Sequence, residues 1–205
     1  MRIISGKFKG ITIKSGKVPG VKPTQGNIRE AFFNIIAATT KFEEKSFLDM
    51  FAGFGGNGLE AMSRGAKVVT FLDKSPAAVK FISQNILDIE KKTGIKANAY
   101  ILKDDVFTGF KKLERRKIAF DILFLDPPYD TDLVREVVLY LLRSYKKGKG
   151  LLNNDFVLGA EWEFKRNEEF LADINALKMP ENMSIENRKY GSHSLLIIRG
   201  GSYAL

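Results

Sequence analysis

The sequence predicts an α/β fold: a seven-stranded, mostly parallel sheet with an antiparallel pair of strands at the carboxyl end and a β-hairpin extension at the amino end. The first observation is that short apolar segments alternate with segments of helical periodicity over residues 46–161. This pattern is typical of parallel sheets covered by helices on both faces. The second is that the strand-like segments 183–190 and 194–199 follow each other with no helix between them. Two such strands pair antiparallel and close the sheet.

The amino end predicts a separate extension. Apolar positions around Gly6 and Gly10 in residues 1–14 indicate two short strands joined as a hairpin. We therefore divide the chain into a basic β-hairpin extension at 1–22 and a main domain at 23–205.

The main domain predicts helices and strands in alternation. It opens with a helix over 27–38, because Asn27 and Glu30 resemble a capping box and apolar residues recur behind them at helical spacing. The strands are expected at 46–50, 67–72, 97–102, 120–125, near 156–161, and at 183–190 and 194–199. The other helices are expected at 59–64, at 76–92, after Val106 and at 132–145.

Composition excludes several kinds of site. The chain has 205 residues, enough to bury a core without staples, and no cysteine, which rules out disulfides, thiolate metal sites and cysteine nucleophiles. No apolar run approaches the roughly 20 residues of a membrane helix, and the amino terminus lacks the apolar core of a signal peptide. We expect a monomeric, cytoplasmic protein that uses neither a metal nor a membrane.

The charge is unevenly distributed along the chain. Lys and Arg number 33 against 24 Asp and Glu, a net charge of +9. Residues 1–22 hold basic side chains and no acidic one, and residues 111–117 form a second basic concentration. A polyanion such as a nucleic acid is the partner that this distribution favours, and a merely solvated basic surface is the alternative.

A glycine-rich turn follows the first strand of the alternating region. Gly53, Gly55 and Gly58 have the spacing G-x-G-x-x-G, which permits a tight turn and close approach of the backbone to a ligand. Dinucleotide-binding enzymes share this spacing. Asp73 lies 20 residues after Gly53, where a ribose-binding carboxylate is expected for a dinucleotide and for S-adenosylmethionine alike.

Asp49 distinguishes between the two cofactors. It precedes the glycines, where its charge would repel a pyrophosphate but attract the ammonium and sulfonium of S-adenosylmethionine. The methyl donor is therefore favoured, and a turn-capping Asp49 is the alternative. Asp104 and Asp105 follow the third strand. Asp105 is the better candidate to accept a hydrogen bond from adenine, unless the pair only opens the next turn.

The strongest motif is Asp126-Pro127-Pro128-Tyr129, directly after the strand at 120–125. This position is the carboxyl edge of the sheet, where ligands of open α/β folds bind. The two prolines fix backbone angles, so the Asp126 carboxylate and the Pro127 carbonyl form a rigid pair of acceptors. These two acceptors can receive hydrogen bonds from both N–H groups of a base amine, which directs the lone pair of its nitrogen at a donor methyl group. Tyr129 would stack on the base, which must be unstacked or flipped out. A proline-rich structural turn is the alternative.

These motifs together resemble the RsmD-like family of bacterial 16S ribosomal RNA guanine-N2 methyltransferases. The resemblance covers nearly the whole chain and rests on residues 1–10, 22–24, 28–34, 48–66, 73–74, Asn85, Asp105, 120–129 and 188–191.

The resemblance implies a Rossmann-like methyltransferase domain at 23–205 that uses S-adenosylmethionine to methylate a guanine N2 amino group in small-subunit rRNA, either free or in an assembly intermediate. The residues implied to bind the cofactor are Asp49, Phe51, Gly53, Gly55, Asp73, Lys74 and Asp105. The catalytic set is Asp126, Pro127 and Tyr129, and the substrate set is Lys7, Lys9, Thr24, Arg29 and Pro128. Phe54, Asn57 and Asp73 depart from the residues usual in that family.

Two other functions fit the same motifs. A DNA adenine-N6 methyltransferase would use Asp126-Pro127-Pro128-Tyr129 in the same way, although the chain lacks a separate target-recognition region. A catalytically silent nucleic-acid-binding assembly factor would keep the fold alone, and the intact Asp126 argues against it.

Overall fold

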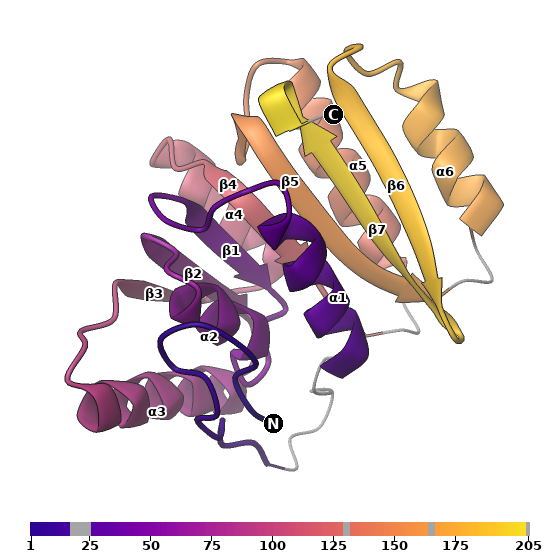
Figure 1. Cartoon of the computed structure of the whole chain (residues 1–205). Coiled ribbons are helices and arrows are strands. Elements are labelled where there is room, and N and C mark those ends of the chain that lie inside the picture. The colour runs from indigo at the N-terminus through magenta and orange to yellow at the C-terminus, as the bar shows by residue number, and fades with distance from the viewer. Residues whose placement is uncertain (17–25, 129–131, 164–166, 204–205) are drawn as a thin grey trace.

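The computed structural model describes residues 1–16, 26–128, 132–163 and 167–203 and centres on one seven-stranded sheet (Figure 1). The strands are β1 (Ser46–Met50), β2 (Val68–Asp73), β3 (Ala99–Lys103), β4 (Phe120–Leu125), β5 (Leu152–Glu163), β6 (Met183–Tyr190) and β7 (His193–Gly200). Their order is β3-β2-β1-β4-β5-β7-β6, with β1 to β5 parallel and β7 antiparallel to both β5 and β6. The predicted sheet and its antiparallel carboxyl-terminal pair are confirmed.

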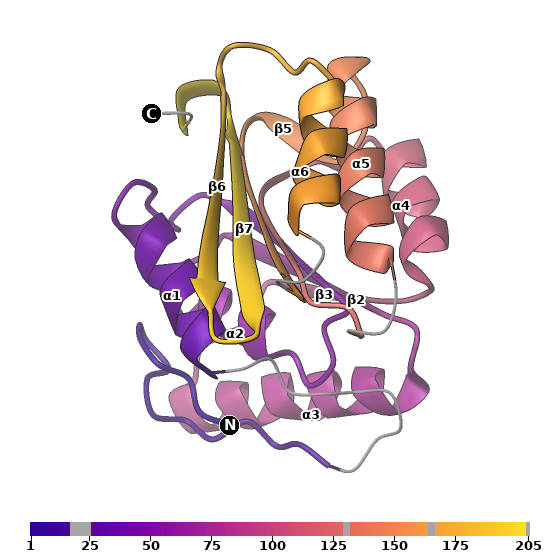
Figure 2. The ribbon, with the colours of Figure 1, turned by 90° about the vertical axis from the view of Figure 1, so that its right-hand side faces the viewer.

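Helices cover both faces of the sheet, as the edge-on view shows (Figure 2). They are α1 (Gly26–Ala37), α2 (Gly56–Ser63), α3 (Pro76–Thr93), α4 (Val106–Arg115), α5 (Leu133–Lys146) and α6 (Asn167–Ala176). Buried side chains of α1, α2 and α3 form one apolar core with the sheet, and those of α4, α5 and α6 form a second core on the opposite face. No described helix is both long and apolar enough to cross a membrane.

Aromatic packing fixes the direction of α1 across the sheet. Phe33 lies on Phe47 near the start of β1, with ring centroids 5.9 Å apart, whereas Phe32 lies 4.5 Å from Phe124 near the end of β4. Gly159 of β5 makes room for this contact, because a Cβ there would stand 2.1 Å from the Phe32 ring. The first turn of α1 therefore points toward the carboxyl edge of the sheet, where ligands of this architecture bind.

The amino-terminal segment is less regular than predicted. Instead of two strands, it contains a single antiparallel bridge between Arg2 and Thr12, flanked by a hydrogen bond from Ile3 N–H to the Ile11 carbonyl of 3.0 Å. The boundary proposed at residue 22 falls outside the described residues and stays a prediction.

The amino-terminal segment is attached to α2 by hydrogen bonds. Both carboxylate oxygens of Glu60 accept backbone N–H groups, from Ile4 at 2.7 Å and Ser5 at 3.0 Å. Phe8 N–H donates to Ser63 Oγ at 2.9 Å. This attachment satisfies backbone N–H groups that do not pair within the hairpin.

Two elements differ from the sequence prediction. Helix α6 was not predicted, because its buried apolar positions Phe170 and Ile174 are too few to give a clear helical pattern in ten residues. Strand β5 begins at Leu152, earlier than predicted, and the polar run 153–155 concealed its start.

Candidate active site

Three carboxylates meet at the carboxyl edge of the sheet. Asp49 lies near the end of β1, Asp73 ends β2, and Asp126 follows β4. Asp49 is in register with Phe71 of β2 and Phe124 of β4, so Asp73 and Asp126 lie two positions beyond it on the neighbouring strands, toward the carboxyl edge. The sequence prediction that Asp49 and Asp126 belong to one edge is consistent with this placement.

Asp49 is the most unusual of these groups. It is fully buried, its Oδ2 accepts the Gly58 N–H at 2.8 Å, and its Oδ1 has no hydrogen-bond partner in the described part of the chain. Burial raises the pKa of Asp49 well above its usual value; hydrogen bonding from Gly58 N–H and the Asn57 side chain opposes this rise, and the nearby charges of Asp126 and Asp73 add to it. An unpartnered buried carboxylate oxygen is a place for a cationic ligand group. This is the fit that the ammonium of S-adenosylmethionine requires.

The glycine loop turns sharply between β1 and α2. Gly53 and Gly55 have φ angles of +55° and +85°, and the non-glycine Phe51 shares this left-handed region at +58°. Gly58 brings α2 close to β2, because a Cβ there would lie 2.2 Å from the Phe71 ring. The loop therefore presents its backbone at the same edge as Asp49.

Asp73 holds this loop in place. Its Oδ2 accepts the Gly53 N–H and its Oδ1 accepts the Ser75 N–H, both at 2.8 Å. Each carboxylate oxygen has a second lone pair for another donor, so a ribose contact stays a prediction. Lys74 is exposed beside it.

Asp105 caps helix α4. Its Oδ1 accepts the Thr108 N–H at 3.1 Å, and hydrogen bonds with Thr108 lower the pKa of Asp105. Asp104 pairs with Lys112 at 2.7 Å. Asp105 therefore has the turn-opening role that the sequence left open, whereas Asp104 forms an ion pair, and the adenine contact of Asp105 stays a prediction.

The Asp126-Pro127-Pro128 turn leaves β4 at this edge. Asp126 and Pro128 are half-buried and Pro127 is buried. The last pairing of β4 with β5 joins Leu125 to Ala160, which brings Glu161 beside this turn. Tyr129 and Thr24, two predicted site residues, lie outside the described residues.

The predicted RNA-contacting residues separate into two places. Lys7 and Lys9 are exposed in the turn that docks on α2, where Lys7 N–H donates to the Ser63 carbonyl at 2.7 Å. Arg29 is buried and contacts α2, because a Cβ on Gly56 would stand 3.0 Å from Arg29 Nη1. Arg29 therefore borders the glycine loop, and the two lysines do not share its pocket.

Sequence reasoning missed two buried acids. Glu60 binds the amino-terminal segment, and its signal was a charged residue at an otherwise buried helix position. Glu161 is fully buried, with its Oε1 3.6 Å from His193 Nδ1. Within the described ranges, no group of three or more His, Cys, Asp or Glu side chains is arranged to hold a metal ion.

Comparison with known proteins gives matches over most of the chain. The family model described as "Conserved hypothetical protein 95" matches residues 1–199. The putative rRNA methyltransferase YlbH of Bacillus subtilis is 31% identical over 161 residues, 78% of this chain and 82% of that protein. Ribosomal RNA small subunit methyltransferase D of Buchnera aphidicola (subspecies Acyrthosiphon pisum) is 31% identical over 155 residues, 76% of this chain and 74% of that protein.

Solved structures show the same fold. The putative methyltransferase yhhF of Escherichia coli superposes with a TM-score of 0.75 at 24% identity, over 98% of this chain and 99% of that one. A putative SAM-dependent methyltransferase of Streptococcus mutans superposes with a TM-score of 0.60 at 16% identity, over 88% of this chain and 50% of that one. With the match over residues 1–199, these findings show that the chain belongs to the conserved hypothetical protein 95 family, that of the RsmD-like proteins its motifs resemble.

Proposed function

We propose that this protein uses S-adenosylmethionine to methylate small-subunit ribosomal RNA, and that its target atom is the exocyclic N2 of a guanine. The observation that carries the proposal is the unpartnered Oδ1 of buried Asp49 at the sheet edge from which the Asp126-Pro127-Pro128 turn leaves. The names of the relatives support the rRNA class. The choice of guanine N2 rests on the family resemblance.

The cofactor supplies a methyl group activated on a cationic sulfur. Asp49 would hold its ammonium, and the glycine loop would let the cofactor approach the backbone at Gly53 and Gly55. Asp73 would keep that loop in position through its bond to Gly53 N–H. Phe51, Lys74 and Asp105 complete the proposed cofactor site, and the S. mutans protein supports the cofactor class by its name.

The proposed catalytic groups act by orientation. A base amine is a poor nucleophile, because its lone pair is delocalised into the ring. The Asp126 carboxylate and the Pro127 carbonyl would accept hydrogen bonds from its two N–H groups and direct the nitrogen toward the methyl group. Proximity and alignment can contribute several kcal/mol, at most about 7 to 11. We assign stacking of the base to Tyr129.

The proposed substrate contacts are basic or lie next to the site. Lys7 and Lys9 would meet the RNA backbone from the extension at 1–22, and Thr24, Arg29 and Pro128 would lie nearer the target base. We further propose that the protein acts as a monomer in the cytoplasm, where ribosomal RNA is modified.

The test is methyl transfer from labelled S-adenosylmethionine to small-subunit rRNA, free and in assembly intermediates, followed by mass-spectrometric identification of the product. We expect N2-methylguanine, and we expect Asp126→Ala to abolish transfer while cofactor affinity stays nearly unchanged. N6-methyladenine as the product, transfer to DNA alone, or undiminished transfer by the variant would contradict the proposal.

A further inference from the structure

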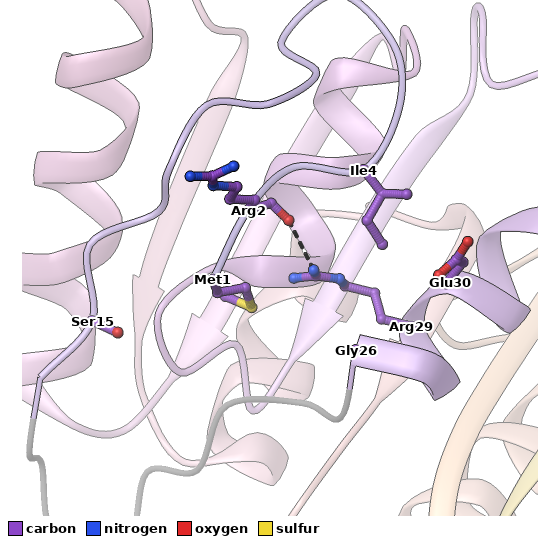
Figure 3. A pocket seen from close by; sticks show the side chains of 7 residues that line it. All are labelled: Met1, Arg2, Ile4, Ser15, Gly26, Arg29 and Glu30. Carbon is purple, nitrogen blue, oxygen red and sulfur yellow. Dashed lines mark hydrogen bonds between the residues drawn. The ribbon is translucent and has the colours of Figure 1, made fainter.

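A pocket of about 530 Å³ opens between the amino-terminal segment and the first turn of α1 (Figure 3). Its lining includes Arg2, Ser15, Gly26, Arg29 and Glu30. Three features of this pocket, namely its innermost side chain, its charge and its position, indicate the same kind of ligand.

The innermost side chain is Arg29, which is only 3% exposed. Its Nη2 donates to the Arg2 carbonyl at 2.9 Å, as the dashed line in Figure 3 shows. Its Nε and Nη1 have no hydrogen-bond partner among the described residues. Buried guanidinium donors without an acceptor are costly, and native proteins rarely leave them so.

No carboxylate in the described part of the chain meets this need. Burial lowers the pKa of Arg29, and Glu60 is the strongest of the charges that oppose this shift. However, the oxygens of Glu60 already accept from Ile4 N–H, Ser5 N–H and Arg64 Nε, the last at 2.9 Å. The free donors of Arg29 therefore suit an anion from outside the chain.

The rest of the pocket is also suited to an anion. Arg2 is exposed at its mouth, and Gly26 begins the twelve-residue helix α1, whose first N–H groups lack partners within the helix. There is no acidic residue in the first turn of α1. Among the described residues of the lining, Glu30 is the one acid, and it is exposed.

The pocket adjoins the proposed cofactor loop. A Cβ on Gly56 would stand 2.6 Å from Met1 Cε and 3.0 Å from Arg29 Nη1, so the start of α2 packs against two of the side chains that line the pocket. A ligand in this pocket would therefore lie next to the methyl-transfer site.

We infer that this pocket holds a backbone phosphate of the RNA strand beside the nucleotide in the active site, with Arg29 as its inner ligand and Arg2 at its mouth. The inference rests on the proposed function, since it places the strand that carries the target base. A phosphodiester has two charged oxygens that accept guanidinium N–H groups in strong, charge-assisted hydrogen bonds.

The test measures the affinity of single-substitution variants for a short, fluorescently labelled single-stranded oligoribonucleotide. Arg2→Gln and Arg29→Gln should each weaken binding about tenfold, as expected for the loss of a hydrogen bond to a charged group. Each should also reduce the slope of log affinity against log salt by about 0.7. Glu30→Gln should strengthen binding, because it removes a negative charge from the lining. Lys91→Gln, which removes an exposed charge near the far end of α3, is the matched control and should change neither quantity.

Calorimetric titration with S-adenosylmethionine shows whether Arg29 binds an RNA phosphate or the carboxylate of the cofactor. Arg29→Gln that loses cofactor affinity but keeps RNA affinity would overturn the inference and assign the guanidinium to the carboxylate of the cofactor. Unchanged RNA affinity in both arginine variants would also overturn it. If Arg29→Gln fails to fold, the opposite effects expected of Arg2→Gln and Glu30→Gln, both at exposed residues, decide the matter. Oligonucleotide binding does not require methyl transfer, so absence of rRNA methylation by the wild type would refute the proposed function separately.

Discussion

Replacing Asp49 by asparagine tests the proposed cofactor site most directly. The side chain keeps its size and an acceptor for Gly58 N–H, which now binds Asp49 Oδ2 at 2.8 Å, but it loses its charge. Opposite charges about 4 Å apart attract by about 4 kcal/mol at the effective dielectric of protein sites. Part of this attraction offsets the desolvation of a fully buried carboxylate, so we expect a net loss of about 2 to 4 kcal/mol, or a roughly 30-fold or greater loss of S-adenosylmethionine affinity.

The pH dependence of the wild type supplies an independent check. Burial raises the pKa of Asp49 in the folded protein above its usual 3.8, so the folded state holds this proton more tightly than the unfolded state. The contribution of Asp49 to folding stability is therefore greatest at low pH and is lost as the pH rises from about the usual pKa through the folded pKa. Cofactor affinity has the opposite trend, because the cation requires the ionised carboxylate.

Isothermal titration calorimetry in buffers of different ionisation enthalpy measures both the affinity and the protons released. Below the folded pKa of Asp49, the affinity of the wild type should rise up to tenfold per pH unit with proton release, and Asp49→Asn should show neither effect. Urea unfolding should find the variant at least as stable as the wild type at neutral pH. A loss of affinity below threefold, or the same pH dependence in both proteins, would refute the assignment of Asp49 to the cofactor cation.

Three further predictions concern packing and the attachment of the amino-terminal segment. Phe32→Ala should lower the free energy of unfolding by about 3 to 5 kcal/mol in urea titrations, because it empties a site between Phe124 and β5; a loss under 1 kcal/mol would contradict this packing. Gly58→Ala should lower the free energy of unfolding by about 1 to 3 kcal/mol through overpacking against Phe71 and so lower the melting temperature, whereas Gly26→Ala, with no atom within 4 Å of the added Cβ, should not. Glu60→Gln should speed amide hydrogen exchange at residues 4 and 5, because the Glu60 carboxylate accepts hydrogen bonds from both N–H groups. Unchanged exchange there would show that Glu60 does not hold the segment.

The sheet and its edge residues were predictable because they depend on local patterns. Apolar segments at 46–50 and 120–125 gave β1 and β4, and parallel strands bring their carboxyl ends to one edge, which placed Asp49 and Asp126 together.

Contacts between distant parts of the chain were not predictable in the same way. The resemblance implied that Arg29 lies near the active site, but its burial and its free donors depend on the amino-terminal segment folding over it. The cap at Asp105 is local, and the residues alone predicted it as readily as an adenine contact; the assignment of Asp105 to the cofactor came from the family resemblance.

The attachment of the amino-terminal segment to α2 also affects how the chain folds. Ile4 and Glu60 are 56 positions apart, so the segment reaches its final place only after the glycine loop and α2 have formed. Until then Ile3, Phe8 and Ile13, all buried in the native state, are exposed to solvent and to other chains. During synthesis, at about 5 to 20 residues per second, this interval lasts several seconds. The basic amino-terminal segment is therefore exposed to RNA at the ribosome, still unfolded, before the rest of the protein has folded.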